Sequence, residues 1–167
     1  MVKSARRMKD KPVPKRMDDI DLKILRMLQR DGRVSLTAMA RRIGGLTKVA
    51  VSYRVRRLMK SGVIEGFNAK IRPEMVGQGF LFATQLIMKE KGPQAELVAR
   101  KIAALKGVEF VFLTFGQYDA FVIARAGDAT SARALVYQMY EVGGVAGSAT
   151  WVSHTVVKES TEVEIKA

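Results

Sequence analysis

The chain contains no cysteine and a single histidine, His154. Disulfides and thiolate metal ligands are therefore excluded, and one imidazole cannot form a multi-histidine metal site. No apolar run approaches the roughly 20 residues that span a bilayer, and the first residues lack the apolar segment of a signal peptide. We therefore expect a soluble, cytoplasmic protein that uses no metal or cofactor and does not enter a membrane.

Acidic residues are scarce in only one half of the chain. The 167 residues include 29 Lys and Arg against 16 Asp and Glu, a formal net charge of +13. Residues 1–75 hold 20 basic and 7 acidic side chains, whereas residues 76–167 hold 9 of each. A strongly basic segment beside a neutral one indicates a polyanion-binding module joined to a module with a different role.

The first 16 residues form the most basic part of that segment. Lys and Arg alternate there with Pro12 and Pro14, a composition that does not build a packed core. The sequence predicts a flexible arm over residues 1–16. This arm either adds contacts to DNA phosphates or is a disordered tail without that role.

Three helices are predicted after the arm, within a domain spanning residues 17–75. The second covers residues 36–43 and the third about 48–61, each with apolar residues at helical spacing. The expected caps and stops are, in chain order, Asp18 or Asp19 with Asp31 and Gly32, Ser35 with Gly44 and Gly45, and Thr47 with Gly62. Two short helices joined by a tight glycine turn are typical of a helix-turn-helix, whose second helix enters the DNA major groove.

The third helix separates an apolar stripe from a basic, hydroxyl-bearing outer face. Val51, Val55 and Leu58 fall on the inner side, while the arginines and Tyr53 point outward. By itself this pattern also fits a solvated basic face on an ordinary surface helix.

After Gly62 the sequence VIEGFNAKIRP alternates apolar and polar residues, which predicts a small β-hairpin, or wing. The fold expected for residues 18–72 is a winged helix-turn-helix.

The second half predicts a different architecture. Residues 79–88, 108–114, 120–126 and 147–157 are rich in branched and aromatic side chains and are expected to be strands, with helices over 93–106 and 129–141. The order βαββαβ is ferredoxin-like, so the fold class is α+β, with this domain covering residues 76–167.

The predicted strands are apolar on both faces. Phe110 and Phe112 alternate with Val111 and Leu113, although the two helices can cover only one side of the sheet. The exposed apolar face predicts a homodimer formed through the sheet. A two-fold dimer would place its two recognition helices about one DNA turn, roughly 34 Å, or a multiple of it apart, and predicts a near-palindromic operator in double-stranded DNA.

The motifs of both halves resemble those of the Lrp/AsnC (feast/famine) transcription regulators. The resemblance covers DDIDLKILRMLQRDGRVSLTAMA and AMARRIGGLTKVAVSYRVRRLMKSGVIEGF, including the Gly45-Leu46-Thr47 turn, and extends to Gly116-Gln117-Tyr118-Asp119 in the second half. It implies that the ferredoxin-like domain senses a small molecule and forms dimers, tetramers or octamers. Gly44 is an extra residue relative to the usual single glycine, and it lengthens the turn before the recognition helix.

Residues of the helix-turn-helix are assigned to DNA by position. The N-terminal end of the third helix is expected to meet phosphates or base edges, its middle to enter the groove, and the remaining cations to contact phosphates. In that order the candidates are Thr47, Lys48 and Val49; Ser52, Tyr53 and Arg56; and Arg57, Lys60, Arg41 and Arg42. Arg54 lies nearer the buried stripe and is expected to pair with a carboxylate of the first helix.

The turn around Gly116 is the candidate effector site. The resemblance implies that an amino acid binds there at a cleft between subunits, with Asp119 accepting its ammonium group. The candidates are Gly116, Tyr118 and Asp119, and more weakly Thr114, Phe115, Ser153 and His154. The alternative is a tight turn with a capping aspartate, and His154 is expected at the surface or an interface.

Two other function classes were weighed against a regulator. No nucleophile motif, paired histidine or glycine-rich phosphate loop supports an enzyme. A sequence-tolerant architectural DNA-binding protein without an effector remains compatible with the high positive charge, and the salt dependence of binding to specific and random DNA distinguishes it from a regulator.

Overall fold

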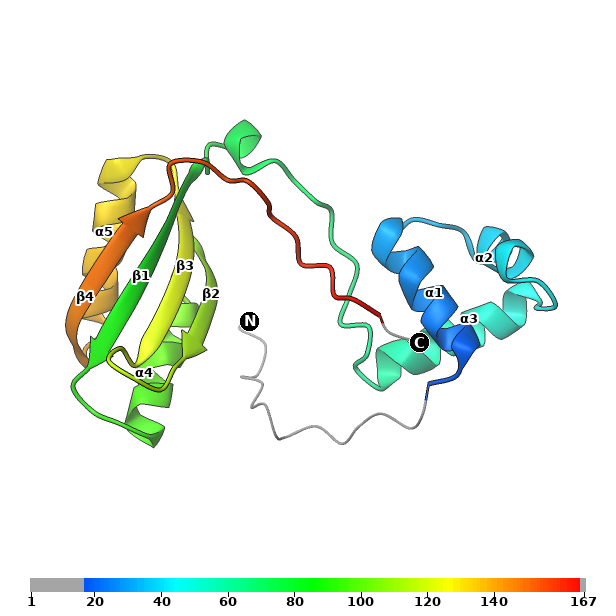
Figure 1. The fold of residues 1–167 in the computed structure, drawn as a ribbon, viewed down its shortest axis with the longest axis horizontal. Helices are drawn as coiled ribbons and strands as arrows, with labels where there is room; N and C mark the ends of the chain where they lie inside the picture. The colour runs from blue at the N-terminus through cyan, green and yellow to red at the C-terminus, as the bar shows by residue number, and fades with distance from the viewer. Residues whose placement is uncertain (1–16, 166–167) are drawn as a thin grey trace. The chain divides into compact units, whose positions relative to one another are not determined.

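The computed structural model describes residues 17–165, which form two compact units (Figure 1). Residues 17–70 together with residues 159–165 make a helical unit, and Ile71–Lys158 makes a unit built on a β-sheet. The predicted arm, residues 1–16, lies outside the described residues. No helix within residues 17–165 is long and apolar enough to cross a membrane.

The helical unit contains α1 (Asp19–Arg30), α2 (Leu36–Ile43) and α3 (Lys48–Lys60). Each helix begins where a short polar side chain accepts a backbone N–H three residues ahead: Asp18 from Asp21, Ser35 from Ala38 and Thr47 from Ala50. Their apolar stripes meet in one core, whose fully buried members are Ile24, Met39, Val51 and Leu58. The three helices and caps predicted from sequence are confirmed, with α3 ending one residue earlier.

The turn between α2 and α3 uses both of its glycines. Gly44 and Gly45 have φ angles of 78° and 67°, in a region that L side chains rarely adopt. A Cβ added at either position would meet no atom within 4 Å. Glycine is therefore required here for its backbone conformation and not because space is short. Two consecutive positive φ angles turn the chain between Ile43 and Leu46.

The predicted wing is wrong. Residues 63–72 form no strand and continue from α3 as extended chain. The backbone N–H groups of Val63 and Ile64 both donate to the Leu58 carbonyl, and their side chains pack on the helical core. Phe67 approaches Gly32, where an added Cβ would lie 3.6 Å from the ring. The apolar residues of the alternating pattern thus pack on the helices, and no second strand is needed to bury them.

A segment from the end of the chain completes the helical unit. Arg26 on α1 donates to the Ile165 carbonyl from Nε (3.3 Å) and Nη2 (3.0 Å). The Ile165 side chain packs on the same core as α1 and α3. Residues 159–165 therefore group with the helices, whereas the sequence prediction placed them in the second domain.

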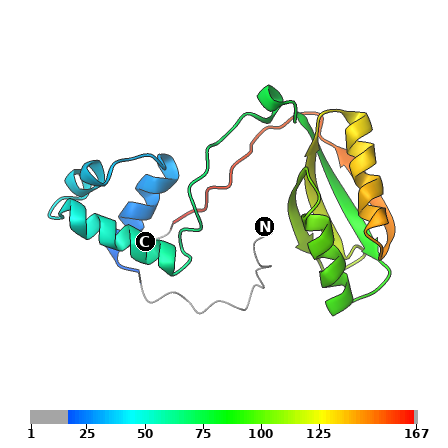
Figure 2. The same cartoon turned by 180° about the vertical axis from the view of Figure 1, so that it is seen from behind.

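The second unit is a four-stranded antiparallel sheet of order β2-β3-β1-β4. Its elements are η1 (Pro73–Val76), β1 (Phe80–Met88), α4 (Pro93–Ala103), β2 (Val108–Leu113), β3 (Ala120–Ala126), α5 (Ala129–Glu141) and β4 (Val145–Val152). Figures 1 and 2 show α4 and α5 on the same face of the sheet. Phe82, Leu86, Val122, Ile102 and Met139 fill the space between the layers. The βαββαβ order is confirmed.

The largest differences from the predicted bounds are at the ends of β4 and α4. Strand β4 ends at Val152 and not at residue 157, because β1, the strand it pairs with, begins at Phe80 and offers no partner before that residue. The last bond between the two runs from the Ser153 N–H to the Leu81 carbonyl. Helix α4 ends at Ala103, before the predicted residue 106. Residues 153–164 form no helix or strand and are exposed.

The other face of the sheet is apolar, and no helix within residues 17–165 covers it. Phe110 and Phe112 of β2 stack with ring centroids 6.1 Å apart and are 41% and 49% exposed. Trp151 of β4, which pairs with Ala83, and Ile87 of β1 add further exposed apolar surface. The sheet therefore has the two-faced apolar character that its sequence predicts.

Candidate nucleic-acid interface and effector turn

Helix α3 presents the predicted contact residues on its outer side. Val49 and Tyr53 are 72% and 62% exposed, large values for apolar and aromatic side chains. Lys48, Arg56 and Lys60 are exposed beside them, and Ser52 is partly buried. The Thr47 hydroxyl oxygen accepts the Ala50 N–H at 3.1 Å, so its own proton remains available for an acceptor. Arg41 and Arg42, in the last turn of α2, are also exposed.

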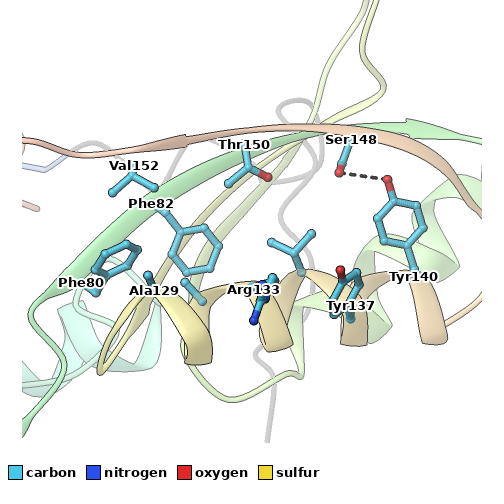
Figure 3. A pocket seen from close by; sticks show the side chains of 11 residues that line it. Phe80, Phe82, Ala129, Arg133, Tyr137, Tyr140, Ser148, Thr150 and Val152 are labelled. Carbon is cyan, nitrogen blue, oxygen red and sulfur yellow. Dashed lines mark hydrogen bonds between the residues drawn. The ribbon is translucent and has the colours of Figure 1, made fainter.

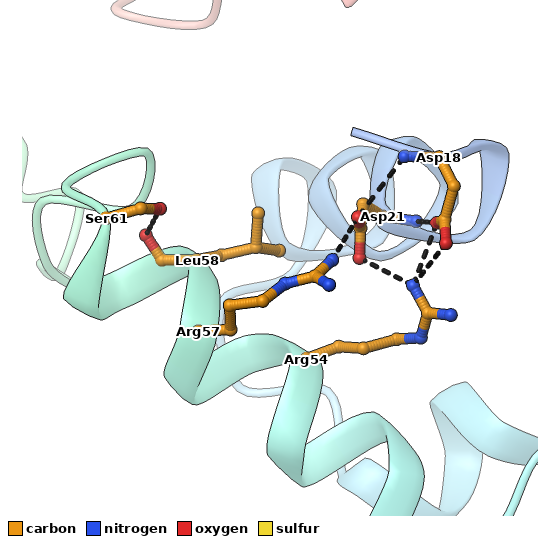
Figure 4. A network of polar contacts seen from close by, with 6 residues as sticks. All are labelled: Asp18, Asp21, Arg54, Arg57, Leu58 and Ser61. Atoms are coloured by element: carbon orange, nitrogen blue, oxygen red, sulfur yellow. Dashed lines mark hydrogen bonds and ion pairs between the residues drawn. The ribbon is translucent and has the colours of Figure 1, made fainter. Parts of the chain in front are cut away.

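Two arginines of α3 are held by carboxylates of α1 (Figure 4). Arg54 Nη1 lies 2.7 Å and 2.8 Å from the two oxygens of Asp18 and 2.9 Å from Asp21 Oδ1. Arg57 bonds the other oxygen of Asp21, whose side chain is fully buried. The prediction that Arg54 pairs with a carboxylate of the first helix is confirmed.

The network stabilises the charged forms of Asp18 and Arg54. The Asp21 N–H and, next, the Arg54 guanidinium lower the pKa of Asp18, and the bonds to Asp18 and Asp21 raise the pKa of Arg54. Asp18 and Asp21 also form a reciprocal capping box at the start of α1. The acids that begin α1 are therefore the same acids that position α3.

The pairing of Arg57 qualifies its predicted role. The sequence assigns Arg57 to a phosphate, but its guanidinium bonds Asp21 while 47% of the side chain stays exposed. The free cations of the outer face are Lys48, Arg56 and Lys60, for which no ion pair occurs among residues 17–165. Sequence periodicity cannot show this difference, because Arg57 and Asp21 are 36 positions apart.

In the second unit, the Asp119 carboxylate is engaged at both oxygens. Its Oδ2 accepts the Met88 N–H at 2.8 Å and its Oδ1 accepts Lys91 Nζ at 2.5 Å. The Lys91 ammonium and then the Met88 N–H lower the pKa of Asp119. The sequence analysis did not identify Lys91 as part of this site. The one signal that could have indicated it is its place in the connection between β1 and α4, beside this turn.

The remaining candidates divide into two groups. Thr114 Oγ1 donates to the Tyr118 carbonyl at 2.7 Å, Gly116 has a φ of 133°, and the Phe115 side chain is fully exposed. These residues share one turn with Asp119. Ser153 does not join them, because it bonds Leu81 whereas Asp119 N–H bonds Leu86, roughly 17 Å further along β1. His154 is exposed, and its Nδ1 lies 2.8 Å from Thr155 Oγ1.

Known proteins share both the helical motif and the full architecture. Residues 17–59 match the AsnC-type helix-turn-helix domain. The HTH-type transcriptional regulator FL11 of Pyrococcus furiosus is 33% identical over 150 residues, covering 90% of this chain and 97% of that protein. The chain belongs to the Lrp/AsnC family of transcriptional regulators. As a member of this family it is a helix-turn-helix, DNA-binding regulator and not an enzyme.

The names of two further similar proteins include an amino acid. The leucine-responsive regulatory protein of Escherichia coli K12 is 29% identical over 154 residues, covering 91% of this chain and 93% of that protein. A transcriptional regulator from Neisseria meningitidis, solved as a complex with L-Met, shares the fold with a TM-score of 0.80 at 22% identity, covering 89% of this chain and 97% of that one.

Proposed function

We propose that the protein is a sequence-specific regulator that binds a near-palindromic operator through α3. The observation that carries this proposal is the exposed row of Val49, Tyr53 and Arg56 on a helix held in place by buried Asp21. Arg56 suits bidentate recognition of guanine, and the Val49 side chain suits contact with a thymine methyl group. Lys48, Lys60, Arg41 and Arg42 supply phosphate contacts around this row.

Binding to DNA of any sequence is the second candidate. The charge of the first 75 residues, with 20 basic against 7 acidic side chains, favours it because phosphate neutralisation alone gives non-specific affinity. An architectural protein of this kind would bind its own promoter region and a scrambled duplex equally at physiological salt. A regulator binds its operator at least about 1,000-fold more tightly.

Fluorescence anisotropy with the operator and scrambled duplexes distinguishes the two candidate functions. The variant Arg56→Ala then tests the role of Arg56. We expect this variant to lose about 1 to 3 kcal/mol of binding free energy on the operator and less on scrambled DNA. Lys23→Ala, which removes an exposed cation from α1, is the matched control. Equal losses on both duplexes for Arg56→Ala would assign Arg56 to a phosphate.

We also propose that the apolar sheet face joins two copies into a homodimer, the unit from which tetramers or octamers would assemble. Phe110, Phe112 and Trp151 would be covered by the same residues of the partner, as a two-fold interface requires. Each dimer would then carry two α3 helices, one for each operator half-site.

An amino acid effector at the turn of residues 114–119 is the third part of the proposal. Its support is the leucine response named for the Escherichia coli relative and the L-Met complex of the Neisseria protein. An effector ammonium at Asp119 would have to replace Lys91, which bonds the carboxylate in this structure. Lys91→Met should therefore tighten amino acid binding and Asp119→Ala should abolish it while the dimer remains. Calorimetry that finds binding unchanged in both variants would remove Asp119 from the site.

A further inference from the structure

A cavity of about 570 Å³ opens between α5 and the β1–β4 edge of the sheet (Figure 3). It is separate from the turn of residues 114–119, none of which lines it. Its volume lies within the range of small-molecule sites, roughly 300 to 1,000 Å³. The cavity lies wholly within the second unit.

Short side chains on both walls create this space. Helix α5 presents Ala129 and Ala132 where it faces the strands, and the edge strand β4 presents Ser148 and Thr150. Protein interiors pack closely, so small residues opposite one another leave a void unless a larger side chain fills it. Phe82, which is 1% exposed, closes the floor, and Phe80 and Val136 extend the apolar lining.

Three of the four hydroxyls that line the cavity within residues 17–165 have hydrogen-bond partners. Tyr140 Oη and Ser148 Oγ are 2.9 Å apart at one end. Thr150 Oγ1 lies 3.1 Å from Thr84 Oγ1, a fully buried residue. These pairs orient the walls, and Tyr137 carries the one lining hydroxyl without a partner among residues 17–165.

Arg133 is the one charged side chain in the lining. Within residues 17–165 it forms no ion pair, and no carboxylate lines the cavity. Asp128, the acid that begins α5, has its Oδ1 bonded to the N–H and hydroxyl of Ser131. The electrostatic complement of this cavity is therefore a single negative charge.

We infer that the cavity is a second small-molecule site, selective for a monocarboxylate with a branched or aromatic apolar body. The carboxylate pairs with the Arg133 guanidinium, which suits it by its planar fork of donors, and the apolar body lies against Phe80, Phe82 and Val136. A zwitterionic amino acid fits less well, because its ammonium group would lose water without gaining a carboxylate partner. The ligand class is that of 2-oxo acids and short branched carboxylic acids.

Calorimetry on the full-length protein with two matched probes tests the inference. 4-Methyl-2-oxopentanoate and leucine share the same body and differ in the 2-oxo and 2-ammonium groups. We expect the oxo acid to bind and Arg133→Met, which keeps the apolar stem, to weaken it by about 10-fold or more. Arg100→Met, on the other helix of the sheet, is the control and should leave its affinity unchanged.

A filling substitution gives a second readout. Thr150→Phe, on the edge strand, should occupy the cavity and abolish binding of the oxo acid while Trp151 fluorescence reports an intact sheet. The inference is overturned if the oxo acid does not bind at millimolar concentration, if Arg133→Met binds it as well as wild type, or if leucine competes for the cavity with equal affinity. Leucine binding that responds to Asp119→Ala but not to Arg133→Met separates this site from the proposed effector turn.

Discussion

Asp21 is a buried carboxylate that contacts two arginines of the recognition helix. Its oxygens bond Arg54 and Arg57, and its backbone N–H bonds Asp18. An acid removed from water in this way is stable only while its partners remain in place. The position of α3 against α1 therefore depends in part on a buried side chain that lies away from the outer face of α3.

Replacing Asp21 should reveal this dependence. We expect Asp21→Asn to destabilise the helical unit by about 1.5 to 3 kcal/mol, because hydrogen bonds to charged groups are lost and both arginines must find water. Asp19→Asn removes an exposed charge from the same helical turn and is the matched control. Hydrogen exchange of the α1 and α3 amides measures the effect. Equal protection in the two variants would show that Asp21 does not hold α3.

Asp18 makes the helical unit sensitive to acid. Its pKa is lowered in the fold by the Asp21 N–H and by Arg54, so the charged form stabilises the folded state. That contribution is present above the ordinary value of 3.8 and is lost as pH falls through the lower pKa of the folded state. The free energy of unfolding of wild type should thus approach that of Asp18→Asn as the pH falls below about 3.8.

Urea unfolding at a series of pH values measures this difference. Asp119 and Asp128, whose pKa values are also lowered, are present in both proteins, so the comparison isolates Asp18. A stability difference between the two proteins that stays constant down to pH 3 would contradict the assignment.

At the scale of elements, capping residues and apolar periodicity predicted the helices and strands whose bounds depend on neighbouring residues in the sequence. Three capping side chains gave the starts of α1, α2 and α3, and apolar periodicity gave β3 and α5 with the bounds the structure shows. The outer face of α3 followed from the same periodicity. The wing failed because Val63, Ile64 and Phe67 have packing partners on the helices, and the pairing of Arg57 with Asp21 joins distant positions.

The segment of residues 159–165 is an element that no local pattern indicated. We expect Ile165→Asp to cost about 1 to 2 kcal/mol, because it places a charge where an apolar side chain is partly buried on the helical core. Val163→Asp, at a position 69% exposed in the same segment, is the control. Amide exchange in α1 should rise only for Ile165→Asp, while Trp151 fluorescence, which reports the sheet unit, stays unchanged. Equal exchange in both variants would mean that the segment does not stabilise the helices.

At the scale of the whole molecule, the proposed dimer joins two neutral sheet units and carries two basic helical units. Phe112→Asp, which places a charge on the apolar sheet face, should dissociate it, because burial of an unpaired carboxylate opposes association. Leu97→Asp, at an exposed position of α4 on the opposite side of the sheet, is the control. Sedimentation velocity measures the assembly. A Phe112→Asp protein that remains dimeric would place the interface on another surface.

Operator binding should follow the assembly. The dissociated variant is expected to lose affinity for a two-half-site duplex and to keep the weak affinity of one helical unit for a single half-site.

The packing of residues 159–165 on the helical unit also determines when that unit can finish folding during synthesis. Residues 17–70 leave the ribosome first, but the Ile165 carbonyl that accepts Arg26 is made 95 residues after Lys70. At 5 to 20 residues per second, that interval lasts about 5 to 20 s. Throughout it the sheet unit is being built while the apolar surface of α1 that receives Ile165 stays uncovered. The helical unit is thus the first to begin folding and the last to be completed, because residues 159–165 are synthesised only after the sheet.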